Sequence, residues 1–270
     1  MKHKLPSHYN KECIKKCLQD TFPNRRQWII NTGLNISNIF KKYLRLLDYN
    51  GEMIELDFDA IYPTCGDNFL AKFPSFYIKH ILCYIEQCRA DIKKKIDISL
   101  PINNDGLRAL IALTLLLPPA NSFRKNNGKG CKGKGKILQN KDNLIYTEVP
   151  NPQLLRIFPE GTSLPYTETR IRSEATTNVQ PYIMCIQGQE KVSYFVQGDG
   201  FFFDFQKEGT LIAAFDFLFK LYQVLHISYP SSFLNFYNFI DSFIYKINSK
   251  PSNIASSLHI NICNVGESSI

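Results

Sequence analysis

Apolar residues recur at helical spacing through the first half of the chain. One such segment follows Asn35, a residue type that often caps the start of a helix. A second runs from near Pro74 to Lys95, where a run of lysines suits the negative end of a helix dipole. A third begins at Asn104 or Asp105 and stops at a proline pair, because proline lacks the N–H that would continue the helix. The spacing predicts three helices before residue 120.

Later in the chain, apolar and polar residues alternate with a period of two instead of following helical spacing. Residues 181–187, 192–197 and 201–206 predict a short antiparallel meander. Its tip at residues 198–200 reads Gly-Asp-Gly and supplies the positive-φ residues that a tight hairpin needs. Residues 144–149 predict one more strand.

Two apolar helices are predicted after the meander. The first, Thr210 to Leu225, is apolar on nearly all sides, which predicts burial. Its only charges, Asp216 and Lys220, lie one helical turn apart and can pair. The second begins after Ser231 and carries an aromatic stripe. From residue 248 onward Ser and Asn dominate, so we expect a tail of little order, with residues 258–263 as a candidate strand.

These elements predict an α+β fold with a helical N-terminal half. A small antiparallel sheet would pack against two long apolar helices in the C-terminal half. We divide the chain into a flexible basic arm (1–26), a helical subdomain (27–120), a mobile Gly/Lys loop (121–141), an α+β subdomain (142–247) and the tail (248–270).

Composition supports a well-packed core. The 270 residues include 20 Phe and 14 Tyr, enough large rings to fill a sizeable interior. Charged residues follow the first few positions, where a signal peptide would need an apolar stretch. The best candidate for a membrane span, Ala109 to Leu117, is about half the required length. We therefore expect a soluble protein of the cytoplasm or nucleus, with most of its eight cysteines reduced.

Positive charge is concentrated in two segments. The net charge is +8, of which residues 124–141 carry +7 and residues 1–26 carry +5, leaving −4 for the rest of the chain. The folded body is thus slightly acidic and gives no sign of a basic face across the whole fold. Seven residues of the internal segment are the candidate contacts to an anion or to nucleic acid: Arg124, Lys125, Lys129, Lys132, Lys134, Lys136 and Lys141.

The same segment resembles a phosphate-binding loop only in part. Gly128 to Lys134 satisfies G-x-x-x-x-G-K, but Gly135 follows where a Ser or Thr must bind magnesium. The frame that starts at Gly130 ends in Ile137 and fails in the same way. No strand is predicted directly before it. We therefore assign no nucleotide cofactor and expect a solvated loop or an anion-binding one.

Metal binding is not predicted. His3, His8, Cys13 and Cys17 lie near the N-terminus without the close C-x-x-C spacing of a zinc knuckle. Further along, His80, Cys83 and Cys88 fall on one predicted helix, where core or boundary positions are the better interpretation.

No catalytic signature is present either. The acidic residues Glu52, Glu55, Asp57 and Asp59 lie among apolar ones, which predicts the solvent face of a strand. Nucleophile elbows and H-E-x-x-H motifs are missing. Because triads assemble in space, an enzyme remains an alternative, to be judged by whether residues of the following set share a pocket. The set is Glu52, Asp57, His80, Cys185 and His226.

Five C-terminal segments share an aromatic-rich pattern: residues 194–197 (YFVQ), 214–220 (AFDFLFK), 227–230 (ISYP), 236–240 (FYNFI) and 244–245 (IY). They resemble the C-terminal region of a large, uncharacterised animal protein family, some members of which carry an N-terminal sterile alpha motif domain. The proline stop, the Gly/Lys loop and residues 181–183 (PYI) follow the same order as in that family. The resemblance implies a shared fold and a mobile-element or recently expanded origin, without catalytic residues to carry over.

We therefore predict a non-enzymatic intracellular interaction protein with a protein partner and no cofactor. One alternative is an accessory nucleic-acid-binding protein that uses the cationic loop and the N-terminal arm. The other is an enzyme of unforeseen type.

Overall fold

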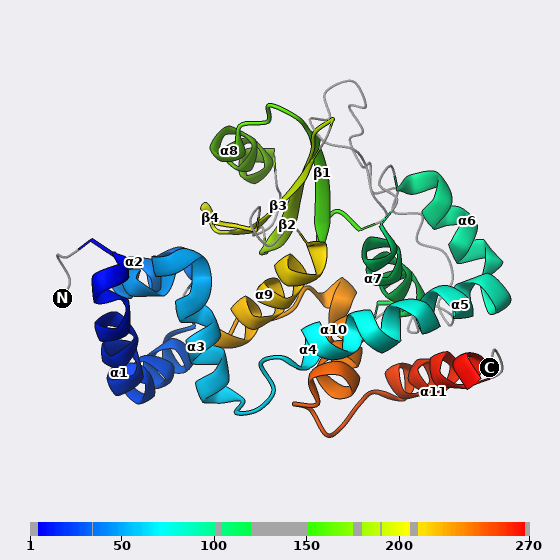
Figure 1. Ribbon diagram of the computed structural model, residues 1–270, viewed down its shortest axis with the longest axis horizontal. Helices are drawn as coiled ribbons and strands as arrows, with labels where there is room; N and C mark the ends of the chain where they lie inside the picture. Colours follow the sequence, from blue (N-terminus) through cyan, green and yellow to red (C-terminus); the bar gives the residue numbers. More distant parts are fainter. Residues whose placement is uncertain are drawn as a thin grey trace, which may run out of the picture.

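A computed structural model describes residues 5–33, 35–100, 104–119, 151–174, 180–189, 191–205 and 210–267. Figure 1 shows a small sheet at the top of the molecule with α8 beside it and α9 beneath it. The helices of the N-terminal half extend to both sides, and α11 runs along the lower edge. The architecture is the predicted α+β fold with a helical N-terminal half.

The segments before the sheet are helical. They are η1 (His8–Asn10), α1 (Lys11–Thr32), α2 (Ile36–Lys42), η2 (Leu44–Gly51), α3 (Glu52–Ile61), α4 (Asn68–Lys72), the π-helical η3 (Phe73–Tyr77), α5 (Ile78–Cys88), α6 (Ala90–Ser99) and α7 (Asp105–Leu116). The predicted cap at Asn35 is confirmed, since its side chain accepts a hydrogen bond from the backbone of α2. The Asn104 side chain caps α7 in the same way. The second predicted helix breaks at Arg89 and becomes α5 and α6.

The second half contains the sheet and the remaining helices. They are β1 (Leu155–Pro159), α8 (Leu164–Glu174), β2 (Tyr182–Gln187), β3 (Val192–Gly198), β4 (Phe201–Asp204), α9 (Leu211–Val224), η6 (Ser231–Phe233), α10 (Leu234–Phe239), the π-helical η7 (Ile240–Tyr245) and α11 (Asn253–Glu267).

The predicted meander is confirmed, and one strand is added to it. The strand order is β1-β2-β3-β4, with β2, β3 and β4 antiparallel and β1 parallel to β2. The crossover between β1 and β2 contains α8, so the sheet is mixed rather than purely antiparallel. One face of the sheet, including Cys185 and Val196, joins the main core around α9. The opposite face, including Met184 and Phe195, packs with Ile171 of α8.

α9 is the central helix, and its side chains are buried in every direction. Aromatic rings from the elements around it cover it. Phe217 packs against Phe203 of β4, with ring centroids 4.7 Å apart. Phe219 stacks on Tyr245 of η7 at 4.0 Å. The prediction of burial on all sides is confirmed.

The two charges of α9 form the predicted pair. Lys220 Nζ lies 2.6 Å from Asp216 Oδ2, and both side chains are almost fully buried. The Tyr245 hydroxyl donates a hydrogen bond to Asp216 Oδ1, and Glu55 Oε1 of α3 lies 3.9 Å from Lys220 Nζ. The buried carboxylate and ammonium thus compensate each other inside an otherwise apolar core.

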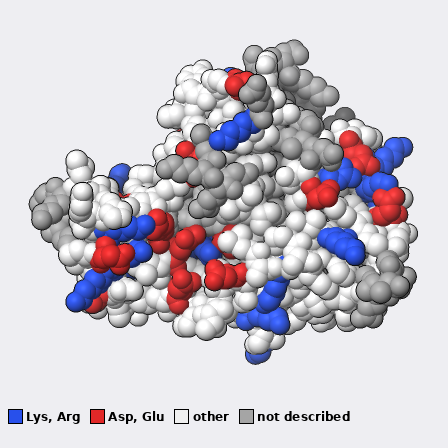
Figure 2. Space-filling model, in the orientation of Figure 1, with Lys and Arg blue, Asp and Glu red and all other residues white. Residues whose placement is uncertain are grey.

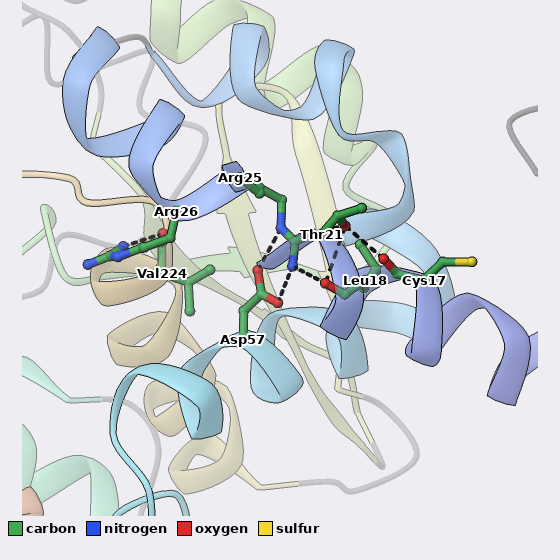
Figure 3. A network of polar contacts seen from close by, with 7 residues as sticks. All are labelled: Cys17, Leu18, Thr21, Arg25, Arg26, Asp57 and Val224. Atoms are coloured by element: carbon green, nitrogen blue, oxygen red, sulfur yellow. Dashed lines mark hydrogen bonds and ion pairs between the residues drawn. The ribbon is translucent and has the colours of Figure 1, made fainter. Parts of the chain in front are cut away.

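A second buried pair attaches α1 to α3 (Figure 3). Arg25 Nε and Nη2 donate to the two carboxylate oxygens of Asp57 at 3.0 and 2.6 Å. Arg25 Nη2 also donates to the Leu18 carbonyl. The next residue, Arg26, donates to the carbonyl of Val224 at the end of α9, 2.9 Å away. These contacts tie α1 to the centre of the fold.

The expectation of a flexible arm over residues 1–26 is therefore wrong for residues 11–26. They lie in α1, whose Ile14, Leu18 and Ile29 are buried in the main core. The arm's lysines and arginines concealed this, because the apolar positions between them are few and widely spaced.

Two predicted strands are helices. Residues 52–59 lie in α3, where the buried positions Met53, Ile54, Asp57 and Phe58 follow the spacing of a helix. Residues 258–263 lie in α11, which buries Ala255, Leu258 and Ile262 three and four residues apart. Short apolar runs fit either period, and tertiary packing selected the helix. The predicted strand at residues 144–149 lies outside the described residues.

Removing one partner of the Arg25–Asp57 pair should be strongly destabilising. Asp57→Ala leaves a guanidinium buried without its carboxylate, which costs about 3–5 kcal/mol of unfolding free energy. The double change Arg25→Met with Asp57→Leu should restore most of it, because apolar side chains need no charged partner. Urea unfolding measures the free energy of unfolding of the single and the double variant. A cost below about 1 kcal/mol for Asp57→Ala would contradict the role given to this pair.

Candidate functional site

The seven basic residues proposed from the sequence as anion or nucleic-acid contacts lie outside the described residues. They are Arg124, Lys125, Lys129, Lys132, Lys134, Lys136 and Lys141. On the face shown in Figure 2, Lys and Arg form separate groups, several of them beside Asp or Glu, rather than one continuous stripe. One group lies at the lower edge, under α10.

Three acidic residues of α3 each contact a different basic residue. Glu52 pairs with Lys11 of α1 at 2.5 Å, and Asp57 holds Arg25. Glu55 lies beside Lys220 of α9. These carboxylates therefore connect helices, and the structure does not gather them around a cavity.

The five residues that would support an enzyme if they shared a pocket do not share one. His80 stacks on Phe76 at 3.9 Å, and the backbone carbonyl of Phe76 lies 2.7 Å from its Nδ1. Burial raises the pKa of the Cys185 thiol to about 12, so it stays protonated. His226 is exposed at the end of α9 with a φ of 52°. None of the five residues lines either of the two cavities described below.

Metal ligands are not grouped in the part of the chain that the structure describes. No set of three His, Cys, Asp or Glu side chains there could hold an ion. Cys13 and Cys17 lie one turn apart on α1 and are exposed, as is His8. His3 lies outside the described residues.

A cavity of about 520 Å³ lies where three distant segments meet, and we call it the α11 cavity. Lys72, Phe76 and Tyr77 come from the end of α4 and from η3. Ser242, Phe243, Lys246, Asn248 and Ser249 come from η7 and the loop after it, and His259 and Cys263 come from α11. A smaller cavity of about 390 Å³ lies at the β2–β3 turn, where Glu160 and Lys191 contribute charges of opposite sign.

Both π-helical segments contribute to the α11 cavity. A π-helix is rare and is often found at functional sites, because its extra residue displaces side chains from the regular helical pattern. In η7, the free carbonyls at its end have partners in α4. Lys72 Nζ donates to the Ile244 carbonyl at 3.1 Å, and Asn68 Nδ2 donates to the Tyr245 carbonyl at 2.8 Å. These bonds fix η7 against α4 and shape one side of the cavity.

Aromatic rings form the wall of the α11 cavity. The His259 ring stacks on Phe243, with centroids 4.1 Å apart and planes within 12° of parallel. Tyr77 lies beside His259, and its hydroxyl donates to the Phe243 carbonyl at 3.1 Å. Phe76 meets Tyr77 edge to face and keeps 37% of its surface exposed. The wall therefore offers flat apolar surface to a ligand.

The hydrogen bonds of Tyr77 decide the protonation of His259. Tyr77 has one hydroxyl proton, which goes to the Phe243 carbonyl because a carbonyl can only accept. His259 Nε2, 3.2 Å from the same hydroxyl oxygen, must therefore carry a proton and donate it. Burial lowers the pKa of His259, and the positive charge of Lys246 lowers it further. His259 is thus a neutral ring at pH 7.

The electrostatics of the α11 cavity are positive. It is lined by Lys72 and Lys246, and no acidic side chain is among the described residues that line it. Burial lowers the pKa of Lys72, and the neighbouring charge of Lys246 adds to this effect. Lys246 is exposed and has a φ of 62°, in the left-handed region, where it ends η7.

One hydroxyl at this cavity has an unmet hydrogen-bonding capacity. Ser242 Oγ is buried and has no hydrogen-bond partner among the described residues. A buried polar atom without a partner costs free energy, so its presence beside a cavity is informative.

A separate polar cluster surrounds Asp241 of η7. Asp241 accepts hydrogen bonds from the Tyr229 hydroxyl and from Gln223 Nε2, both at 3.2 Å. Gln223 in turn accepts one from Tyr62 at 2.9 Å. Burial raises the pKa of Asp241 to about 7, although the hydrogen bond from Tyr229 acts in the opposite direction. The cluster joins α3, α9 and η7.

Sequence reasoning missed the α11 cavity because its residues come from segments about 170 positions apart. One signal was available. His259 and Cys263 are four residues apart, which places them on one face of a helix. Interpreting residues 258–263 as a strand concealed that pair.

Comparison with known proteins found no match, whether among protein-family models, curated proteins or solved structures. None of the helices that the structure describes is long and apolar enough to cross a membrane.

The Asp241 cluster predicts how stability depends on pH. The carboxyl binds its proton more tightly in the folded chain than in the unfolded one, where its pKa is near 3.8. Above pH 7 the folded state holds a half-buried charge that the unfolded state solvates. The free energy of unfolding should therefore fall by up to a few kcal/mol between pH 4 and pH 7 and then level off.

Asp241→Asn should remove this fall, because an amide does not titrate. Urea unfolding at pH 5 and pH 8 compares the two chains, with Asp105→Asn at the exposed start of α7 as a control for losing one carboxyl. The pH 5 to pH 8 difference should shrink in Asp241→Asn and persist in the control. Equal pH profiles for all three chains would contradict the assignment.

Proposed function

We propose that the chain is a non-enzymatic intracellular interaction protein and that the α11 cavity is its partner-binding surface. The observation that carries the proposal is the lining of this cavity. It combines two lysines with a wall of aromatic rings, and none of the described residues in the lining is acidic. Positive charge beside flat apolar surface favours an anionic partner with an apolar part.

Binding is favoured over catalysis because the reactive groups in the described part are held in structural contacts. The buried pairs Arg25–Asp57 and Asp216–Lys220 join helices. Within the α11 cavity, Cys263 Sγ lies 3.8 and 3.9 Å from the two nitrogens of His259. Because Nε2 carries the ring proton, only Nδ1 has a free lone pair, and at 3.9 Å the thiol lies farther from it than a nucleophile lies from its general base.

The intracellular part of the proposal is supported by the cysteines. None of the seven that the structure describes forms a disulfide, as expected for a reducing compartment. The resemblance to the animal family with sterile alpha motif members adds the expectation of a shared fold. It suggests no partner.

Proximity labelling in cells, with the labelling enzyme fused to the chain, tests the proposal. Lys246→Asn removes one positive charge from the cavity and keeps the fold, because asparagine tolerates the left-handed conformation of residue 246. The matched control is Lys94→Asn, which removes one exposed charge from α6. A reproducible set of neighbours should be depleted about fivefold or more by Lys246→Asn only.

Either of two results would count against this function. The first is the absence of any reproducible neighbour of the wild-type chain. The second is equal depletion by both variants, which would assign the effect to net charge instead of the cavity.

A second function, accessory nucleic-acid binding, is favoured by the seven basic residues between Arg124 and Lys141. The N-terminal arm contributes less to it than the sequence suggested. Lys11, Arg25 and Arg26 of α1 are engaged with Glu52, Asp57 and Val224. Nucleic-acid binding would therefore depend mainly on the seven basic residues of the cationic segment.

Changing all seven basic residues to glutamine should weaken binding to a fluorescent DNA duplex and flatten its salt dependence. Each lost phosphate contact reduces the slope of log affinity against log salt by about 0.9. Fluorescence anisotropy over a salt series measures this. Lys93, Lys94 and Lys95 of α6, also changed to glutamine, serve as a control in a described basic run. Unchanged affinity in the sevenfold variant would exclude the cationic segment as the contact.

A further inference from the structure

We propose that the α11 cavity recognises a phosphate group attached to a flat ring. This rests on the proposed function, because it assumes that the cavity is a binding surface, and it specifies what the surface binds. The volume of about 520 Å³ lies within the range of small-molecule sites. The ligand chemistry follows from three properties of the lining: its two lysines, its stacked rings and its unpaired hydroxyl.

The lysines select the charge of the ligand. Lys72 and Lys246 are close enough for the charge of one to lower the pKa of the other. A phosphate monoester carries about −1.5 to −2 charges at pH 7 and compensates both, whereas a carboxylate compensates only one. Since none of the described lining residues is acidic, no charge of the cavity itself would repel the anion.

The aromatic rings of the lining favour a flat aromatic group as the part of the ligand that carries the phosphate. The stacked pair of Phe243 and His259 gives a rigid wall, since Tyr77 holds both partners through its hydroxyl. Phe76 of η3 adds a partly exposed ring to the lining. A neutral histidine and phenylalanine rings stack well on a flat aromatic group. A phosphate without a ring would leave this wall in contact with water.

The buried hydroxyl of Ser242 supplies the remaining contact. A serine hydroxyl rotates about its bond and can donate to any acceptor within reach. Ser242 Oγ has none among the described residues, and Ser242 is one of the residues that line the cavity. An oxygen of a bound phosphate would give it an acceptor, in a charge-assisted hydrogen bond. A ligand that supplied this acceptor would offset the cost of burying the hydroxyl without a partner.

Two sources provide this chemistry: a free nucleotide, or a phosphorylated tyrosine of a partner protein. Isothermal titration calorimetry of the full chain distinguishes them with adenosine 5′-monophosphate and O-phospho-L-tyrosine. Each is compared with its parent lacking phosphate, adenosine or tyrosine. Phosphoserine and inorganic phosphate provide the charge without the ring. At least one ring phosphate should bind about tenfold or more tightly than its parent and than phosphoserine.

Two variants test the contacts. Lys246→Asn should weaken binding of the preferred ring phosphate about tenfold, and Ser242→Ala about fivefold. Ser242→Ala is expected to fold normally, because it removes a hydroxyl that has no partner among the described residues. Lys94→Asn on α6 should leave the affinity unchanged. Urea unfolding of each variant confirms that it is folded.

The proposal is overturned if both ring phosphates bind no tighter than phosphoserine, or if Lys94→Asn weakens binding as much as Lys246→Asn. If ring phosphates fail but proximity labelling still depends on Lys246, the partner-binding function stands and only the ring-phosphate assignment falls. If ring phosphates bind through Lys246 and labelling recovers no protein, the cavity takes a free nucleotide and the interaction function falls.

Discussion

The fold depends on covering one helix on every side. α9 is apolar around its whole circumference, so any exposed side would cost hydrophobic free energy. The sheet covers one side of it, α3 another, and α4, α10 and η7 the rest, largely with aromatic rings. Gly51 illustrates the tightness, since an added Cβ would lie 2.4 Å from the Phe217 ring.

The burial of α9 also determines which charged side chains are free to interact with a ligand. A charge inside this core must have a partner, and Asp216 with Lys220 meets that need within a single helix. Arg25 and Asp57 do the same between α1 and α3. Because these groups are occupied by each other, they cannot act on a ligand. The described groups best placed to meet one lie away from α9, in the α11 cavity.

The α11 cavity owes its form to irregular helices. η3 and η7 are both π-helical, and each contributes aromatic side chains to the lining. Lys72 and Asn68 donate hydrogen bonds to the backbone carbonyls at the end of η7, and these bonds hold the irregular segment in place. Rigid rings, two lysines and a buried serine hydroxyl together make a site for recognition, in which preorganised groups reduce the entropy cost of binding.

Local pattern in the sequence determined the fold class, the meander, the cap at Asn35, and the burial of α9 with its ion pair. Each follows from the spacing of neighbouring residues. Tertiary structure alone decided that residues 52–59 and 258–263 are helical, that α1 packs on the core, and that β1 joins the sheet in parallel. It also brought Lys72, Lys246 and His259 together. Those outcomes depend on contacts between distant segments, and short-range periodicity carries no information about them.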